Sequence, residues 1–185
     1  KLISGVEKLA SAVGSTLGPR GRNVLIREGA KQPFITKDGV TVANHFSLED
    51  PIADAAAEIV KQASRRTNVE AGDGTTTSTV LAAAIFKNSV KYLNSNPESS
   101  PVQLYRGLQK LSSALLKDLA EQSRDVRTLE DIKHIATTSA NNDRSIGELI
   151  SMAVDKVGNQ GSITIEDSNT AETTLDLIEG FRFDS

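Results

Sequence analysis

The stretch AGDGTTT at residues 71–77 separates two long helical patterns and is the strongest local feature of the sequence. A glycine turn that leads directly into a helix presents free backbone N–H groups and the positive end of the helix dipole, and both favour phosphate. Three consecutive threonine hydroxyls add donors at the same place. Asp73 would repel a phosphate unless a cation lay between them, so its carboxylate indicates a Mg²⁺ ligand. The stretch therefore predicts a phosphate site with a metal ion.

The same stretch has a purely structural alternative. Asp73 or Thr75 could simply accept hydrogen bonds from the first turn of the helix, and for such a segment taken alone a capping turn is the more frequent explanation. The segment is not a Walker A loop, because the GK[ST] ending is missing. An unrelated phosphotransferase is disfavoured, since no acceptor-site constellation accompanies the motif.

Composition excludes several classes of protein. The 185 residues carry 21 Lys+Arg against 24 Asp+Glu, a net charge of -3, which is too even for binding to nucleic acid or to an anionic membrane. The longest strongly apolar stretch, residues 80–86, is far shorter than the roughly 20 residues that span a bilayer. With no cysteine, two histidines and no tryptophan, thiol chemistry is excluded and zinc clusters are disfavoured. The chemistry must rest on carboxylates, hydroxyls, Lys, Arg and the backbone.

Hydrophobic periodicity predicts a largely helical first 120 residues, with one hairpin. Between residues 23 and 36 two short apolar runs flank a glycine-containing turn, which favours two strands, whereas residues 40–43 fit either a strand or a short helix. The leucines at 104–119 are expected in the core. The predicted helices cover residues 2 to Gly18-Pro19, Asp50-Pro51 to about 67 with Ile52, Ala55, Ala56, Ile59, Val60 and Ala63 inward, 75 to about 92, 104–119, about 129–136 and about 144–156; strands are predicted at 162–166 and 174–178.

Two further motifs carry weaker signals. In TLGPRG (16–21) the glycines could let a nucleotide approach the backbone, but ending a helix is a sufficient reason for Gly-Pro. In TKDG (36–39) a lysine could meet phosphate charge and a carboxylate could orient an attacking water, although Asp-Gly is also a common turn pair.

Taken together and in order, these motifs resemble the group I chaperonins, the bacterial GroEL-like family. The resemblance covers essentially the whole chain and rests on residues 16–23, 36–40, 71–77, Ser139-Ala140-Asn141, and 155–158 through 163–167. It implies a multidomain α/β fold, with a mainly helical equatorial domain that carries a small β-hairpin, followed by part of an α+β intermediate domain. The implied domains are 1–121 for the N-terminal half of the equatorial ATP-binding domain, 122–178 for the N-terminal half of the intermediate domain, and 179–185 for the hinge and the start of the apical domain.

The resemblance also implies an ATPase activity and a set of site residues. Asp38 would position the hydrolytic water, Asp73 would ligate Mg²⁺, and a potassium site would lie near Lys37, Thr16 and Thr76. The nucleotide would be bordered or held by Thr16, Leu17, Gly18, Pro19, Lys37, Gly39, Gly74, Thr75, Thr76 and Thr77.

As a whole, the resemblance implies an ATP-driven, ring-forming subunit, in a single or double ring, that helps non-native polypeptides to fold, with a co-chaperonin as a further partner. Neither nucleic acid nor membrane is expected as a partner, and the expected location is the cytoplasm of a bacterial or virus-infected cell or an organelle matrix. We expect the sequence to be a fragment of a longer, divergent chain, because both ends lie within patterned segments. The alternative is a truncated, non-catalytic structural or interaction module.

Overall fold

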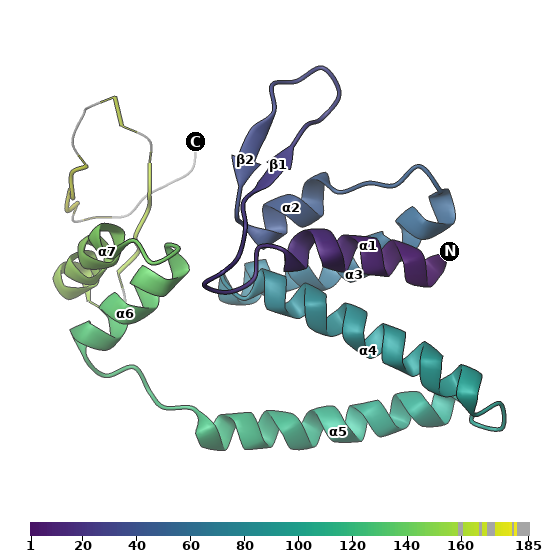
Figure 1. The fold of residues 1–185 in the computed structure, drawn as a ribbon. Coiled ribbons are helices and arrows are strands. Elements are labelled where there is room, and N and C mark those ends of the chain that lie inside the picture. Colours follow the sequence, from purple (N-terminus) through teal and green to yellow (C-terminus); the bar gives the residue numbers. More distant parts are fainter. Residues whose placement is uncertain (159–160, 167, 170–172, 179, 181–185) are drawn as a thin grey trace. The chain divides into compact units, whose positions relative to one another are not determined.

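The computed structural model describes residues 1–158, 161–166, 168–169, 173–178 and 180, and the chain divides into two compact units, Lys1–Leu116 and Lys117–Ser185. The predicted mainly helical fold with one small sheet is confirmed (Figure 1). No helix in the described ranges is long and apolar enough to cross a membrane. The elements are α1 (Leu2–Gly14), β1 (Val24–Ile26), β2 (Phe34–Thr36), α2 (Gly39–His45), α3 (Pro51–Ala71), α4 (Thr75–Ser95), α5 (Pro101–Gln122), α6 (Leu129–Ser139) and α7 (Arg144–Val157).

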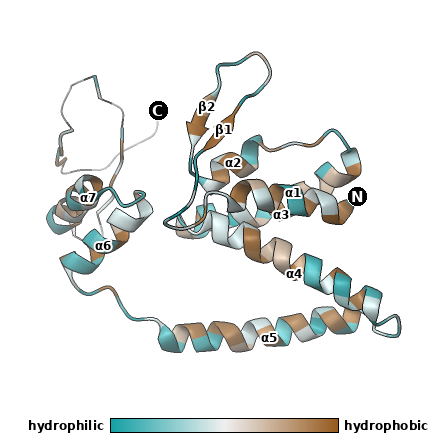
Figure 2. Cartoon of the chain, in the orientation of Figure 1, coloured by the Kyte–Doolittle hydropathy of each residue, from teal (hydrophilic) through white to brown (hydrophobic). Residues whose placement is uncertain are grey.

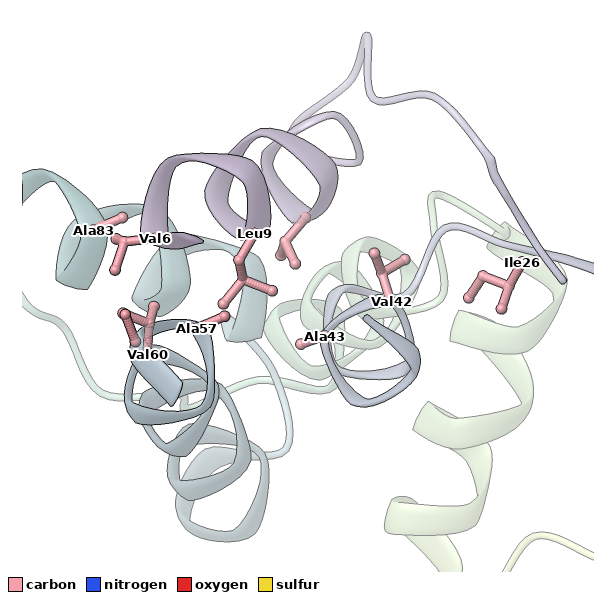
Figure 3. Close-up of a cluster of buried hydrophobic side chains, with 10 residues drawn as sticks. Val6, Leu9, Ile26, Val42, Ala43, Ala57, Val60 and Ala83 are labelled. Atoms are coloured by element: carbon pink, nitrogen blue, oxygen red, sulfur yellow. The ribbon is translucent and has the colours of Figure 1, made fainter. Parts of the chain in front are cut away.

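Helices α1 to α4 and strand β1 share one core in the first unit (Figure 3). Helix α1 packs against α2, α3 and α4, and α2 also contacts α3. Small side chains on α3 and α4 allow the helix backbones to approach closely, while α1 supplies the larger groups. The buried core residues are Val6, Leu9, Val13, Ile26, Val42, Ala43, Ala56, Ala57, Val60 and Ala83.

The predicted N-terminus of α3 is confirmed in detail. Asp50 is the N-cap, and its Oδ1 accepts hydrogen bonds from the backbone nitrogens of Ile52 and Ala53, each at 3.0 Å. Pro51 occupies the start of the helix, where a missing N–H costs nothing. The helix continues four residues beyond its predicted end and stops at Gly72, whose left-handed backbone (φ 71°) is the usual way to end a helix.

The predicted hairpin is also confirmed. Strands β1 and β2 pair antiparallel, with Val24 opposite Thr36 and Ile26 opposite Phe34. Residues 40–43, which the sequence left open, belong to the short helix α2. The ring of Phe34 meets that of His45 edge-on, with centroids 5.2 Å apart, so the hairpin touches the last turn of α2.

Two details of the helical prediction are wrong in the first unit. Helix α1 ends at Gly14 rather than at Gly18-Pro19. On α3 the predicted inward face is rotated, because Ile52 and Ile59 are exposed whereas Lys61 and Ser64 are buried. The face of α3 that packs against α1 and α4 is rich in small side chains. A prediction based on large apolar residues therefore identifies the wrong face of this helix.

The leucine stripe of α5 was expected in the core, and this expectation is wrong for the described chain. No residue of α5 is buried, and the exposed apolar side chains include Leu111, Leu115 and Leu119. Figure 2 shows hydrophobic residues along the whole helix. An amphipathic helix gains its stability by burying such a face. Where α5 meets α4, side chains that include Leu81, Ile85, Leu104 and Leu108 line a groove.

The second unit is built on the helix pair α6 and α7, which the sequence predicted to within three residues at each end. Thr128 and Asp131 form a reciprocal capping box at the start of α6, and the hydrogen bond from the Thr128 hydroxyl is the main cause that lowers the pKa of Asp131. The helices approach closely at Gly147, where a β-carbon would lie 2.0 Å from Oγ1 of Thr137.

The strands predicted at 162–166 and 174–178 are not formed, since both segments are irregular. Alternation favours a half-buried strand, but a strand also needs a neighbour to take its backbone hydrogen bonds. Neither segment pairs with another described segment. Apart from Gly180, the predicted hinge and start of an apical domain at 179–185 lie outside the described residues.

Candidate phosphate site at the start of helix α4

The turn between α3 and α4 begins α4 on a glycine N-cap, which has no side chain to accept bonds from the first-turn N–H groups. Gly72 (φ 71°) and Gly74 (φ 80°) both adopt left-handed backbone conformations, which glycine tolerates without strain. Gly74 is the N-cap and makes no side-chain hydrogen bond to the helix, and the first intrahelical bond runs from the nitrogen of Ser78 to the carbonyl of Gly74 at 3.0 Å. The N–H groups of residues 75–77 therefore have no acceptor within the helix.

Asp73 lies in the turn that precedes α4. Its Oδ1 accepts a hydrogen bond from the backbone nitrogen of the adjacent Gly74 at 2.6 Å, and its side chain is exposed. The capping alternative named Asp73 or Thr75 as the acceptor for helix N–H groups. Thr75 is instead buried, and its own carbonyl accepts from the hydroxyls of Ser78 and Thr79, both at 2.9 Å.

The loop after α1 reaches the start of α4 through Thr16. Thr16 is 5% exposed, and its Oγ1 lies 2.8 Å from the carbonyl oxygen of Val13 and 3.1 Å from Oγ1 of Thr76. Leu17, Gly18 and Pro19 follow as an exposed stretch of the same loop. The structure thus joins two motifs that are 60 residues apart in the sequence.

The start of α2 packs directly against the start of α4 at Gly39. A β-carbon on Gly39 would lie 2.1 Å from Oγ1 of Thr76, 3.0 Å from its backbone nitrogen and 3.1 Å from Oγ1 of Thr75. Contacts of about 2 Å are impossible for real atoms, so only glycine fits here. Gly39 therefore allows α2 to approach the candidate phosphate site.

Asp38 is the N-cap of α2 and lies next to this contact. Its Oδ2 accepts hydrogen bonds from the backbone nitrogen of Thr41 at 2.8 Å and from the Thr41 hydroxyl at 2.5 Å, while Oδ1 takes no part in these bonds. The segment 36–39 is not a turn between two strands, the alternative considered above, because it links β2 to a helix. The carboxylate is thus exposed and held in one orientation.

The structure brings together five of the predicted site residues, namely Thr16, Lys37, Gly39, Thr75 and Thr76. Lys37 is near Thr16 because both pack against Gly21. A β-carbon on Gly21 would lie 2.9 Å from Cε of Lys37 and 2.0 Å from the carbonyl oxygen of Thr16. Leu17, Gly18, Pro19, Asp73, Gly74 and Thr77 are exposed on the flanking loops and on the first turn of α4.

The packing roles of two residues near this region were not predicted from the sequence. Gly21 is needed for the close approach of Lys37 to the loop, and the recurrence of glycine in TLGPRG was its only signal. Lys61 is buried in the middle of α3. Nothing in its periodic position indicated its contact with α2.

Comparison with known proteins identifies the family of the chain. Residues 9–185 match the sequence model of the TCP-1/cpn60 chaperonin family. The chain belongs to this chaperonin family. The matched region includes every residue of the candidate site.

Two solved chaperonin structures are similar to the chain. The chaperonin gp146 from the bacteriophage EL 2 of Pseudomonas aeruginosa, determined in the presence of ATP-BeFx, shares 27% identity with a TM-score of 0.67, over 87% of this chain and 28% of that one. A group III chaperonin in the open state shares 22% identity with a TM-score of 0.70, over 86% of this chain and 31% of that one, and this second likeness concerns the fold alone. The chain thus spans less than a third of either chaperonin.

Proposed function

We propose that this chaperonin chain is the nucleotide-binding portion of an ATP-dependent, ring-forming subunit of the group I type, which assists the folding of non-native polypeptides. The observation that carries the proposal is the packing of Gly39 against Thr76, because Gly39 directly follows Asp38 and Thr76 lies in the first turn of α4. Support also comes from the family match and from a 27% identical phage chaperonin that was solved in the presence of ATP-BeFx. In this proposal residues 1–121 belong to the equatorial domain, 122–178 to the intermediate domain and 179–185 to the hinge and apical domain.

The open first turn of α4 suits a triphosphate. The N–H groups of residues 75–77 and the flexible backbone at Gly74 would hold phosphate oxygens, as free helix N-termini do in many nucleotide sites. The loop 16–19 would border the nucleotide, and Lys37 would offset phosphate charge. The absence of a β-carbon at Gly39 lets the start of α2 pack against Thr75 and Thr76 in this first turn.

Asp73 can serve as a Mg²⁺ ligand only if phosphate and water supply the other oxygen ligands of the ion. Among the described residues no group of three or more His, Cys, Asp or Glu side chains could hold a metal ion. Mg²⁺ typically uses one or two carboxylates together with phosphates and water, so a single aspartate beside the phosphate site meets its needs. Bound there, the ion would neutralise negative charge on the phosphates. A potassium ion near Lys37, Thr16 and Thr76 is a further part of the proposal.

Asp38 is assigned the role of orienting the water that attacks the terminal phosphate. The two hydrogen bonds from Thr41 fix its Oδ2, which leaves Oδ1 to accept a hydrogen bond from that water. In this proposal the subunit has two conformations, and ATP and ADP bind them with different affinities. Hydrolysis would therefore change which of the two conformations is favoured. Ring assembly in single or double rings, client binding and a co-chaperonin belong to the full-length protein in this proposal.

We expect Asp73→Ala in the full-length protein to reduce ATP turnover at least about 100-fold, since loss of metal-based charge stabilisation costs several kcal/mol. A coupled assay over a series of Mg²⁺ concentrations measures the effect, and high Mg²⁺ should restore part of the activity. Asp118→Ala is the matched control, because that carboxylate is exposed on α5 and contacts only Gln122 at 2.8 Å among the contacts described. Unchanged turnover in Asp73→Ala would refute the metal assignment.

The same samples test the assembly. Both variants and the unaltered protein should sediment as one large ring-sized species, because neither carboxylate lies in the hairpin or the core. A monomer in all three samples, with and without nucleotide, would contradict the ring-forming part of the proposal.

A further inference from the structure

Lys61 is a buried cation whose partners join two helices. Its side chain is 3% exposed, and its Nζ forms an ion pair with Oε1 of Glu58 at 2.5 Å. The same Nζ donates a hydrogen bond to the backbone carbonyl oxygen of Phe46. An ammonium group is costly to bury unless its charge is paired and its hydrogens are bonded, so these contacts must be maintained for α3 to pack as it does.

The acceptor of that hydrogen bond marks the end of α2. Phe46 is the C-cap of this helix, where carbonyl groups lack partners within the helix and a positive charge is favourable. A second cation of α3 supports the same turn, because Nε of Arg65 donates to Oδ1 of Asn44 at 2.9 Å. Glu58 links the two cations, and the hydrogen bond from Lys61 is the main cause that lowers the pKa of Glu58.

Helix α2 is short enough to transmit a displacement from one end to the other. It has 7 residues, a length of about 10 Å at 1.5 Å per residue. Its first residue, Gly39, packs against Thr76, and its N-cap is Asp38. The buried Val42 and Ala43 hold its middle, and Lys61 and Arg65 hold its last turn. If the last turn is released, the helix can tilt and the carboxylate of Asp38 moves with it.

We propose that Lys61 is a positioning residue for Asp38, acting through the hydrogen bond that anchors the C-terminal end of α2. The inference rests on the proposed ATPase function, in which Asp38 orients the attacking water. Lys61 itself touches neither the phosphates nor the water. Its loss should therefore affect the rate of hydrolysis more than the affinity for nucleotide, since the phosphates are held by α4.

The test uses Lys61→Met in the full-length protein, with Lys87→Met as the matched control. Lys87 also forms an interhelical ion pair, at 2.6 Å with Glu7, but its side chain is 59% exposed and it joins α4 to α1 without contacting α2. Two quantities are measured: kcat and KM for ATP hydrolysis, and hydrogen exchange of the α2 backbone amides without nucleotide. In Lys61→Met we expect kcat to fall about 10- to 100-fold, with little change in KM and faster exchange in α2. Lys61→Arg should recover part of kcat.

Several outcomes would overturn the inference. In the first, Lys61→Met has the same kcat as Lys87→Met and differs only in a lower melting temperature. In the second, Lys61→Met leaves the hydrogen exchange of the α2 backbone amides unchanged. If the unaltered protein hydrolyses no ATP, the proposed function fails, and α2 exchange alone then decides whether Lys61 anchors the helix. If Lys61→Met does not assemble, Arg65→Met is tested in its place. Arg65 is exposed, and its replacement removes only the hydrogen bond to Asn44 and the ion pair with Glu58. A smaller loss of kcat with faster α2 exchange supports the inference, and no change in either overturns it.

Discussion

Replacing Gly39 with alanine is expected to lower the affinity of the full-length protein for Mg·ATP about 10- to 100-fold, because the new methyl group would lie 2.1 Å from Oγ1 of Thr76. To relieve this overlap α2 must move away from α4, which disturbs both Asp38 and the first turn of α4. Such overpacking typically costs about 1–3 kcal/mol, so the melting temperature should fall as well. Calorimetric titration with a non-hydrolysable analogue measures the affinity.

The internal control is the double variant Gly39→Ala/Thr76→Ala, compared with Thr76→Ala alone. Removing Oγ1 of Thr76 takes away the most severe contact and leaves neighbours at 3.0 and 3.1 Å, which a small shift can accommodate. The two substitutions should therefore be strongly non-additive, with Gly39→Ala costing much less in the Thr76→Ala background. Full affinity in Gly39→Ala itself would mean that the two helices do not meet as described.

Asp38→Asn is expected to reduce kcat for ATP hydrolysis about 10²- to 10⁴-fold, the usual contribution of a general base or water-orienting group. Asparagine caps helices about as well as aspartate, so α2 should remain in place and nucleotide affinity should be retained. Single-turnover measurement of phosphate release, with bound nucleotide counted separately, distinguishes loss of chemistry from loss of binding.

Asp50→Asn is the matched control for this substitution. Asp50 is also an N-cap whose carboxylate accepts hydrogen bonds from helix N–H groups, but it begins α3 and is not among the residues that gather around Thr76. Its replacement should leave kcat essentially unchanged. If Asp38→Asn and Asp50→Asn hydrolyse ATP at the same rate, Asp38 does not act on the attacking water.

The local features of the fold could be predicted from sequence because their causes are local. Asp50-Pro51 begins α3 through local backbone preferences, as predicted. The end of α3 at Gly72 lies four residues beyond the predicted end. The hairpin followed from two apolar runs around a glycine-containing turn. The strands at 162–166 and 174–178 failed because pairing depends on a partner that a local pattern does not contain.

The burial of helix faces was harder to predict, because it depends on what packs against them. The α5 stripe with Leu111 and Leu115 has the pattern of a core helix, yet no described element covers it. A local pattern predicts that a face is apolar, but it does not contain the segment that packs against that face. Conversely, Lys61 can be buried because its Nζ donates a hydrogen bond to the carbonyl oxygen of Phe46, which is 15 residues away in the sequence.

The candidate site was predicted in part. The motifs lie in three separate segments, and the structure brings Thr16, Gly39 and Thr76 of these segments together. What sequence alone could not supply is the reason for the glycine at position 39, which is a close approach between helices. The contributions of Gly21 and Lys61 were missed for the same reason, since each depends on a contact between segments rather than on a local motif.

The most direct test of the central claim is a cryo-electron microscopy map of the full-length protein with Mg²⁺ and a non-hydrolysable ATP analogue. We expect the phosphates to lie within hydrogen-bond distance of the backbone nitrogens of residues 75–77, with Mg²⁺ beside Asp73 and the terminal phosphate facing Asp38. A triphosphate bound elsewhere, or a bound triphosphate that contacts neither the first turn of α4 nor Asp73, would contradict it.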